Sequence, residues 1–210
     1  MNNCYFCIEG RDFSVAKKKL GPHWPFENDV VYNNSTVFAV IGSAPQVIPY
    51  ILILPYRHIF SLAEMNDNEW NGFIECMKFL KNNGGYGEKL CFFEHGGPSS
   101  GGASSIDHCH VHVIDGRIGL YEKNEFAEYR LYENITNFSV LKNIEHYLLI
   151  GEFLENDTLN IKVSCGQAAR ESQFFRRQLA EHIMSREWDW RLDNKIDRMI
   201  SIMNGFKKGD

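Results

Sequence analysis

Three histidines alternate with small apolar residues in the sequence HCHVHVI at residues 108–114. Alternation with a period of two, in a β-branched setting, predicts a strand whose three imidazoles share one face, with Cys109 and the valines on the other. A loop runs directly into this strand, and eight of its ten residues, 96–105, are glycine or serine. Imidazoles exchange protons near neutral pH, and backbone amides and hydroxyls in such a loop bind anions. The pattern therefore indicates phosphoryl chemistry. A metal site remains the alternative, because alternating histidines also chelate zinc or iron.

The run HCHVHVI resembles the motif of the histidine-triad (HIT) superfamily at every position. The resemblance implies that His110 is the nucleophile, attacking the α-phosphorus of a nucleotide conjugate to give a covalent nucleotidyl-histidine. It also implies that His112 contacts the α-phosphate, adding positive charge if protonated, and that His108 orients the site. The galactose-1-phosphate uridylyltransferase branch has glutamine at the third position, so His112 favours the hydrolase branches.

Two cysteines near the N-terminus, Cys4 and Cys7, have the C-x2-C spacing with which two thiolates grip one tetrahedral zinc. Reduced bystanders or a redox pair would have the same spacing. In zinc-bearing HIT proteins the other two ligands are a histidine in a PxRH turn and the first triad histidine. Here the turn PYRH ends at His58 and the first triad histidine is His108. The resemblance therefore implies a structural Zn2+ site that takes no part in the chemical step.

Several further residues are candidates for substrate binding. Many HIT proteins have a glutamine just before the serine or threonine that precedes the triad, and this chain has serine there. Paired arginines in a C-terminal helix favour a clamp on distal phosphates, with an exposed helix face as the alternative. The resemblance implies Phe38 of the first hairpin as a base platform, with a core residue as the alternative. His95 at a strand end is a candidate phosphate contact, with a surface hydrogen bond to the loop as the alternative. The other candidates are Ser104 and Ser105 in the loop and Gln173, Arg176 and Arg177 in the helix.

Length and composition exclude several classes of protein. The 210 residues are 44% hydrophobic and 23% charged, as in an ordinary globular protein. The net charge of -5 argues against bulk nucleic-acid binding but not against one small nucleotide. No apolar run is long enough to span a membrane, and MNNCYFCIEG is no secretory signal. We therefore expect reduced cysteines and a cytoplasmic protein, and the resemblance favours a homodimer.

The fold class predicted is α+β, a HIT-like fold with an antiparallel five-stranded sheet and helices, followed by a C-terminal hairpin-helix extension. Residues 1–117 would form the catalytic core with its zinc knuckle, and residues 118–210 an extension packed on it, not an independent domain. Hydrophobic periodicity and turn residues predict a hairpin at 30–42, a strand after Pro49, a helix over 68–82, a strand over 89–94, a hairpin at 146–164, and helices from about Ser172 and over 193–204.

The substrates expected from the resemblance are dinucleoside polyphosphates, nucleoside phosphoramidates or nucleotidylated sugars. Hydrolysis is the first hypothesis, with His110 attacking as a neutral imidazole. A nucleotidyltransferase or phosphorylase would use the same intermediate with another acceptor. A nucleotide-binding protein that turns over slowly is the rival from outside the enzymes.

Overall fold

The computed structural model describes residues 4–9, 26, 28–87, 89–97, 108–123, 128–154, 156–165, 169, 171–189, 192 and 195–207. The strands are β1 (Val30–Asn33), β2 (Val37–Ile41), β3 (Tyr50–Pro55), β4 (Leu90–Gly96), β5 (Val111–Asp115), β6 (Arg130–Ile135), β7 (Tyr147–Phe153) and β8 (Leu159–Ser164). The α-helices are α1 (Tyr5–Glu9), α3 (Asp67–Asn83), α4 (Leu120–Lys123), α5 (Phe174–His182) and α6 (Ile196–Lys207). Short 3-10 helices are η1 (Leu62–Glu64), η2 (Gly116–Ile118) and η3 (Ser139–Leu141).

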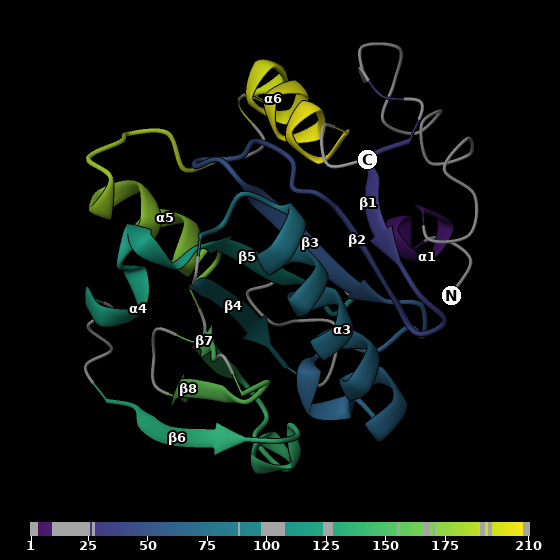
Figure 1. Cartoon of the computed structure of the whole chain (residues 1–210). Coiled ribbons are helices and arrows are strands. Elements are labelled where there is room, and N and C mark those ends of the chain that lie inside the picture. Colours follow the sequence, from purple (N-terminus) through teal and green to yellow (C-terminus); the bar gives the residue numbers. More distant parts are fainter. Residues whose placement is uncertain are drawn as a thin grey trace.

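These strands form one sheet in the order β1-β2-β3-β5-β4-β7-β8-β6, and neighbours run antiparallel (Figure 1). The α+β class with an antiparallel sheet is confirmed, but the number of five strands was wrong. The first five in the order are the expected core. The C-terminal hairpin of β7 and β8, with β6, continues the same sheet, because β7 pairs with β4 along seven residue pairs.

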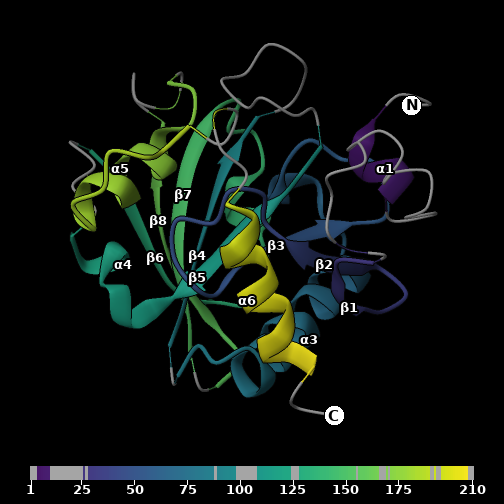
Figure 2. The same cartoon turned by 90° about the horizontal axis from the view of Figure 1, so that it is seen from above.

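The two faces of the sheet carry different helices. Helix α3 packs on one face, where Phe73 meets Phe92 of β4 with ring centroids 5.9 Å apart. Helix α5 packs on the other, where Phe175 meets Phe93 at 4.9 Å. Since adjacent residues of a strand point to opposite faces, Phe92 and Phe93 separate the two layers. In both views β3 and β5 lie between α1 and α5 (Figures 1 and 2).

Local sequence explains the elements around the triad strand. Asn66 caps α3, its side chain accepting from the amide of Glu69, while the Glu69 carboxylate accepts from the amide of Asn66. The first hairpin turns at Asn34, whose side-chain oxygen accepts from the amides of Thr36 and Val37. Both the helix and the hairpin were predicted and are confirmed.

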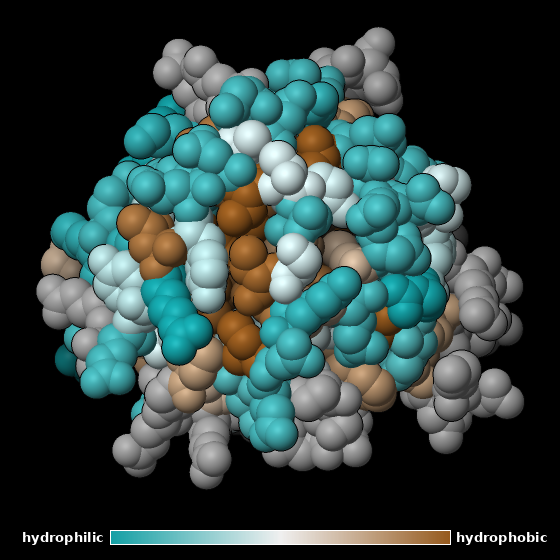
Figure 3. Space-filling view, turned by 90° about the horizontal axis from the view of Figure 1, so that it is seen from below, coloured by the Kyte–Doolittle hydropathy of each residue, from teal (hydrophilic) through white to brown (hydrophobic). Residues whose placement is uncertain are grey.

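The interior is a continuous apolar core built on both faces of the sheet. One outer face of the molecule carries a stripe of hydrophobic residues between polar ones (Figure 3). Among the described residues, no helix is long and apolar enough to cross a membrane.

Candidate active site and metal centre

The triad lies at the start of β5, partly before it. The strand begins at Val111, so the prediction of a strand over residues 108–114 was wrong for its first three residues. The amide of Cys109 donates to the carbonyl of Ile59 over 2.7 Å instead of to a neighbouring strand. His108 and His110 therefore lie on a connection whose path is set by the turn that follows β3.

His110 is held by its own main chain. Its Nδ1 lies 2.7 Å from the carbonyl oxygen of His108. A carbonyl only accepts, so Nδ1 carries the proton and Nε2 keeps its lone pair. Burial lowers the pKa of His110, and nearby His95 lowers it further, against the carbonyl bond that raises it. The ring is still partly exposed. His110 is thus a neutral imidazole whose Nε2 keeps its lone pair.

His112 is neutral as well. Its ring stacks on Phe93, with centroids 4.8 Å apart and planes 13° from parallel, and it lies 5.2 Å from the ring of His110. Burial holds the pKa of His112 well below its usual value, and the neighbouring His110 and Arg176 act in the same direction. A neutral His112 can donate one hydrogen bond, but it carries no positive charge.

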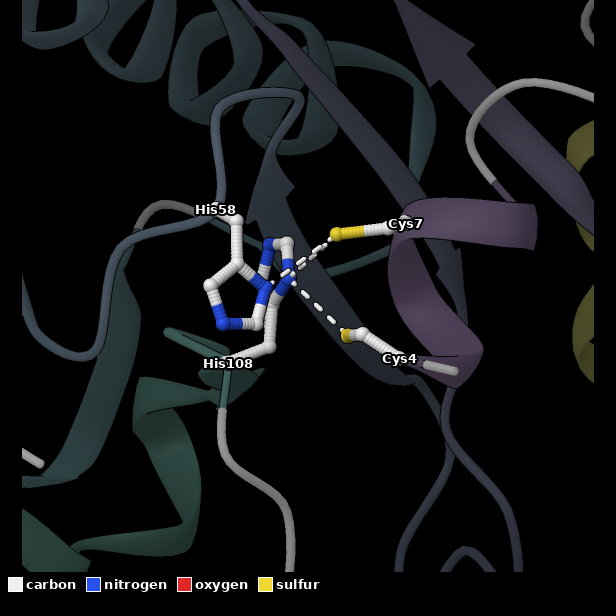
Figure 4. A group of neighbouring side chains, drawn as sticks. All are labelled: Cys4, Cys7, His58 and His108. Atoms are coloured by element: carbon white, nitrogen blue, oxygen red, sulfur yellow. Dashed lines mark hydrogen bonds between the residues drawn. The ribbon is translucent and has the colours of Figure 1, made fainter. Parts of the chain in front are cut away.

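The four predicted zinc ligands meet in one cluster (Figure 4). Their ligand atoms all lie within 4.8 Å of one another. His108 Nδ1 is 3.4 Å from the sulfur of Cys4 and 3.5 Å from that of Cys7, and His58 Nδ1 is 3.2 Å from Cys7. Bonds of tetrahedral zinc to sulfur and nitrogen put two such ligand atoms about 3.5 Å apart. Two thiols and two imidazoles at this spacing fit a metal such as zinc.

A hydrogen bond outside the cluster orients His108, and an ion pair holds the turn that carries His58. His108 Nε2 donates to the carbonyl of Pro55 over 2.9 Å, which leaves Nδ1 as the lone-pair atom facing the cysteines. Burial lowers the pKa of His108 to about 4, so the ring is neutral as a ligand must be. Beside His58, Arg57 donates two hydrogen bonds to Glu69 of α3, over 2.8 and 2.6 Å. The PYRH turn is thereby tied to the helix.

A buried carboxyl supports the triad from behind. Glu94 accepts from the amide of Leu62 over 2.9 Å, from the thiol of Cys109 over 3.2 Å and from the hydroxyl of Tyr147 over 2.5 Å. Burial raises the pKa of Glu94 to about 7, against these hydrogen bonds. Because it faces away from His112, Glu94 positions Cys109 and not the substrate.

The other candidates on or before the sheet have different environments. His95, on β4 two residues after Phe93, donates from Nε2 to the carbonyl of Ala169 over 2.5 Å, and burial lowers its pKa. Phe38 is on the same face as the triad, opposite Leu54, but it is buried and packs on Tyr56. Ser104 and Ser105 lie outside the described residues.

The C-terminal candidates divide into an interior residue and two near the surface. Arg176 is buried and donates to three protein oxygens, which argues against a phosphate clamp for this residue. Arg177 donates to Glu171 over 2.7 Å, and Gln173 donates to Asp189 over 3.4 Å. Among described residues, Arg177 Nε and Gln173 Oε1 are buried without a hydrogen-bond partner.

Sequence reasoning missed the aromatic residues that surround the triad. The hydroxyl of Tyr50 lies 2.8 Å from His112 Nδ1, Phe93 stacks on His112, and Phe6 of α1 packs on His108 and His110. The signal available was alternation: Tyr50 begins β3 two residues before Leu52, which pairs with His112. An expected central strand with a tyrosine at its end would have indicated a polar atom near the triad.

Comparison with known proteins identifies the central part of the chain. Residues 26–119 match the family model described as HIT domain. No curated protein matches the chain.

Solved structures with some similarity include a HIT family hydrolase from Clostridium thermocellum, 22% identical, covering 55% of this chain and 92% of that one with a TM-score of 0.36. Another is a HIT family hydrolase from Legionella pneumophila, 26% identical, covering 55% and 94% with a TM-score of 0.36. A third is the yeast Ap4A phosphorylase Apa2, 12% identical, covering 66% and 62% with a TM-score of 0.42.

The matched range contains His58 and all three triad histidines, while Cys4, Cys7 and helix α5 lie outside it. Residues 26–119 of this chain therefore resemble a HIT domain.

Proposed function

We propose that this protein is a nucleotide hydrolase that cleaves at the α-phosphate of a nucleotide conjugate through a covalent nucleotidyl-histidine on His110. The hydrogen bond of 2.7 Å from His110 Nδ1 to the carbonyl of His108 is the observation that carries the proposal. It leaves Nε2 as a lone-pair nucleophile in a ring that stays neutral at pH 7.

The reaction has two halves. First, Nε2 attacks the α-phosphorus, a phosphorus–nitrogen bond forms, and the bond from phosphorus to the leaving group breaks as that group takes up a proton. Then water attacks phosphorus and loses a proton, the phosphorus–nitrogen bond breaks, and a nucleoside monophosphate departs. The neutral His112 donates a hydrogen bond to a phosphoryl oxygen, which favours the charge that develops there. Substrates of this class are dinucleoside polyphosphates, nucleoside phosphoramidates and nucleotidylated sugars.

Intact-mass analysis tests the intermediate. The protein is mixed with adenylated, guanylated and uridylated conjugates and quenched at neutral pH within milliseconds to seconds. We expect the mass of one nucleotidyl group to be added to the wild type and not to His110→Ala, whose turnover falls by on the order of 10³-fold or more. Undiminished turnover in His110→Ala would defeat the proposal. The conjugate that labels best also reports the base.

The acceptor separates hydrolysis from its rivals. With water alone the product is a nucleoside monophosphate, and with orthophosphate present a phosphorylase gives a nucleoside diphosphate. Nucleotide bound without any turnover would identify a binding protein. Product analysis by ion-exchange chromatography, with and without phosphate, distinguishes these three outcomes.

We also propose that Cys4, Cys7, His58 and His108 hold one structural zinc ion. The distances within the cluster and the hydrogen bond from His108 to Pro55 support it. The bound metal would tie α1 and the PYRH turn to the triad, and the chemical step does not use it. Elemental analysis of untagged protein should give one zinc per chain, and a clear shortfall would contradict the site.

The homodimer and the cytoplasmic location stay predictions. Light scattering after size-exclusion chromatography measures the mass in solution.

A further inference from the structure

A buried arginine of helix α5 reaches the triad through one side chain. The guanidinium of Arg176 donates from Nε to the carbonyl of Trp188 over 2.9 Å and from one terminal nitrogen to the carbonyl of Ala44 over 2.7 Å. The other terminal nitrogen lies 3.3 Å from the hydroxyl of Tyr50. An arginine has only donors, so Tyr50 must accept in this last contact.

The hydroxyl of Tyr50 passes this constraint on to His112. Tyr50 is fully buried, and burial raises its pKa, so it keeps its proton. Its oxygen accepts from Arg176 and lies 2.8 Å from His112 Nδ1. With the oxygen occupied by a donor, the single hydroxyl proton is directed to Nδ1. The ring then carries its own proton on Nε2.

The opposite arrangement has a physical cost. If His112 donated from Nδ1, Tyr50 would accept from two donors and its own proton would lack an acceptor among the described residues. A buried donor without a partner is destabilising, because it has lost its hydrogen bonds to water and gained none in the protein. An imidazolium at this place would also lie close to the charge of Arg176, with only the Tyr50 hydroxyl between them.

Phe175, the residue before Arg176 in α5, reaches the face of the His112 ring through Phe93. Phe175 packs on Phe93 with centroids 4.9 Å apart, and Phe93 stacks on His112 at 4.8 Å. Two consecutive residues of α5 therefore fix two properties of His112, one the plane of the ring and the other the position of its proton.

We propose that Arg176 and Phe175 are positioning residues of the C-terminal extension, which hold His112 through Tyr50 and Phe93 as a neutral ring with Nε2–H free to donate to a phosphoryl oxygen. The role toward a phosphoryl oxygen rests on the proposed function. The position of the proton does not, and it is measured on the free protein.

Nitrogen NMR of the imidazoles tests the proton position directly. The metal-loaded protein is labelled with 15N-histidine, and the His112 signals are assigned with His112→Gln. We expect a pyrrole-type Nε2 and a pyridine-type Nδ1 at pH 7. A protonated Nδ1 in the wild type would overturn the inference.

Two variants test the chain of contacts. Tyr50→Phe removes only the hydroxyl, and we expect the His112 signals to become those of a mixture of tautomers. Arg176→Gln removes the charge, and we expect His112 to take up a proton at higher pH than in the wild type. Signals that do not change in Tyr50→Phe, or a titration that does not move in Arg176→Gln, would contradict the proposed linkage.

Arg198→Gln is the matched control. Arg198 of α6 donates to the carbonyls of Pro45 and Gln46 over 3.1 and 3.0 Å, in the same loop as Ala44. Among the described residues no hydrogen bond joins it to Tyr50. We expect Arg198→Gln to leave the His112 signals as in the wild type, and a change as large as in Arg176→Gln would mean that the loop, not the arginine, matters.

Kinetics then distinguish this inference from the proposed function. Tyr50→Phe should lower kcat roughly ten- to a hundredfold with a smaller change in KM, as for outer residues that orient a functional group. The expected tautomer in a protein that forms no nucleotidyl adduct would defeat the proposed function and leave the proton position standing. A normal nucleotidyl adduct together with a protonated His112 Nδ1 would support the proposed function and defeat this inference.

Discussion

Helix α1 near the N-terminus and helix α5 near the C-terminus both reach the triad, but they hold its histidines by different chemistry. Cys4 and Cys7 surround His108 with ligand atoms suited to a metal. Arg176 and Phe175 reach His112 through hydrogen bonds and stacked rings. The central His110 is bound at Nδ1 by the main chain of His108, and Phe6 of α1 packs on its ring. We therefore expect substitutions at Cys4 or Cys7 to affect His110 through His108. Substitutions at Phe175 or Arg176 should affect only His112.

The largest effect is expected from breaking the N-terminal side. Cys7→Ser removes one thiolate, and we expect loss of the metal and of about 4 kcal/mol or more of the free energy of unfolding, the stabilisation by a ligand at a thousand times its Kd. Urea unfolding with and without chelator measures this. Cys165→Ser, at an exposed cysteine outside the cluster, is the control. Equal stability with and without metal would contradict a structural role.

The second largest effect is expected at Glu94, which lies on the face of β4 away from His112 and accepts a hydrogen bond from Cys109. Its pKa is raised to about 7 in the folded protein, so folding is favoured while the carboxyl is protonated. That contribution is complete below the ordinary value near 4.5 and is lost as the pH rises through about 7. We expect Glu94→Gln to gain on the order of 3 kcal/mol relative to wild type between pH 4 and 8.

Unfolding curves at several pH values check this, with Glu133→Gln on the exposed part of β6 as control. The lowered pKa of His112 acts in the opposite direction, since a ring kept neutral loses stability as the pH falls below about 6.5. A difference between Glu94→Gln and wild type that stays constant with pH would contradict the assignment.

A third prediction sharpens the C-terminal side. Phe175→Leu shortens the stack on Phe93, and we expect a loss of about 1–2 kcal/mol together with a shift of the His112 ring protons. Phe174→Leu, one residue earlier on the helix, should leave those ring protons in place. Equal shifts in both variants would show that the helix as a whole, and not the Phe175 ring, acts on His112.

The smallest effect is expected at Arg177, whose side chain is 39% exposed and pairs with Glu171. Its pairing is a surface ion pair, worth about 0–1 kcal/mol. We expect Arg177→Ala to lower turnover a few-fold on a long polyphosphate substrate and less on a phosphoramidate. Steady-state kinetics on both substrates measure it, and equal losses would rule out a contact to distal phosphates.

The contrast between the metal cluster at α1 and the Arg176–Tyr50 contact at α5 also explains what the sequence could predict. The C-x2-C spacing predicts Cys4 and Cys7 as ligands, and the resemblance to HIT proteins implies His58 of the PYRH turn and His108. These four residues do come together. The contact between Arg176 and Tyr50 joins residues 126 positions apart and depends on how α5 packs.

The sequence alone does not distinguish the two adjacent arginines, Arg176 and Arg177. Helix α5 begins after Gln173, and its phase turns Phe175, Arg176, Leu179 and Ala180 inward while Arg177 stays near the surface. The start of the triad strand at Val111, three residues later than predicted, could not be read from the sequence either. Alternation extends to His108, but the amide of Cys109 binds Ile59, and no local pattern predicts that partner.

The seven residue pairs between β4 and β7 have a consequence for any shortened version of the protein. A fragment ending at Arg117 would retain every triad histidine, yet β4 would become an edge strand with a row of unpaired amides and carbonyls beside apolar side chains such as Phe92. Such edges invite pairing with other chains. We therefore expect the fragment to self-associate. In the whole protein β7 covers this edge of β4 and so protects it from pairing with other chains.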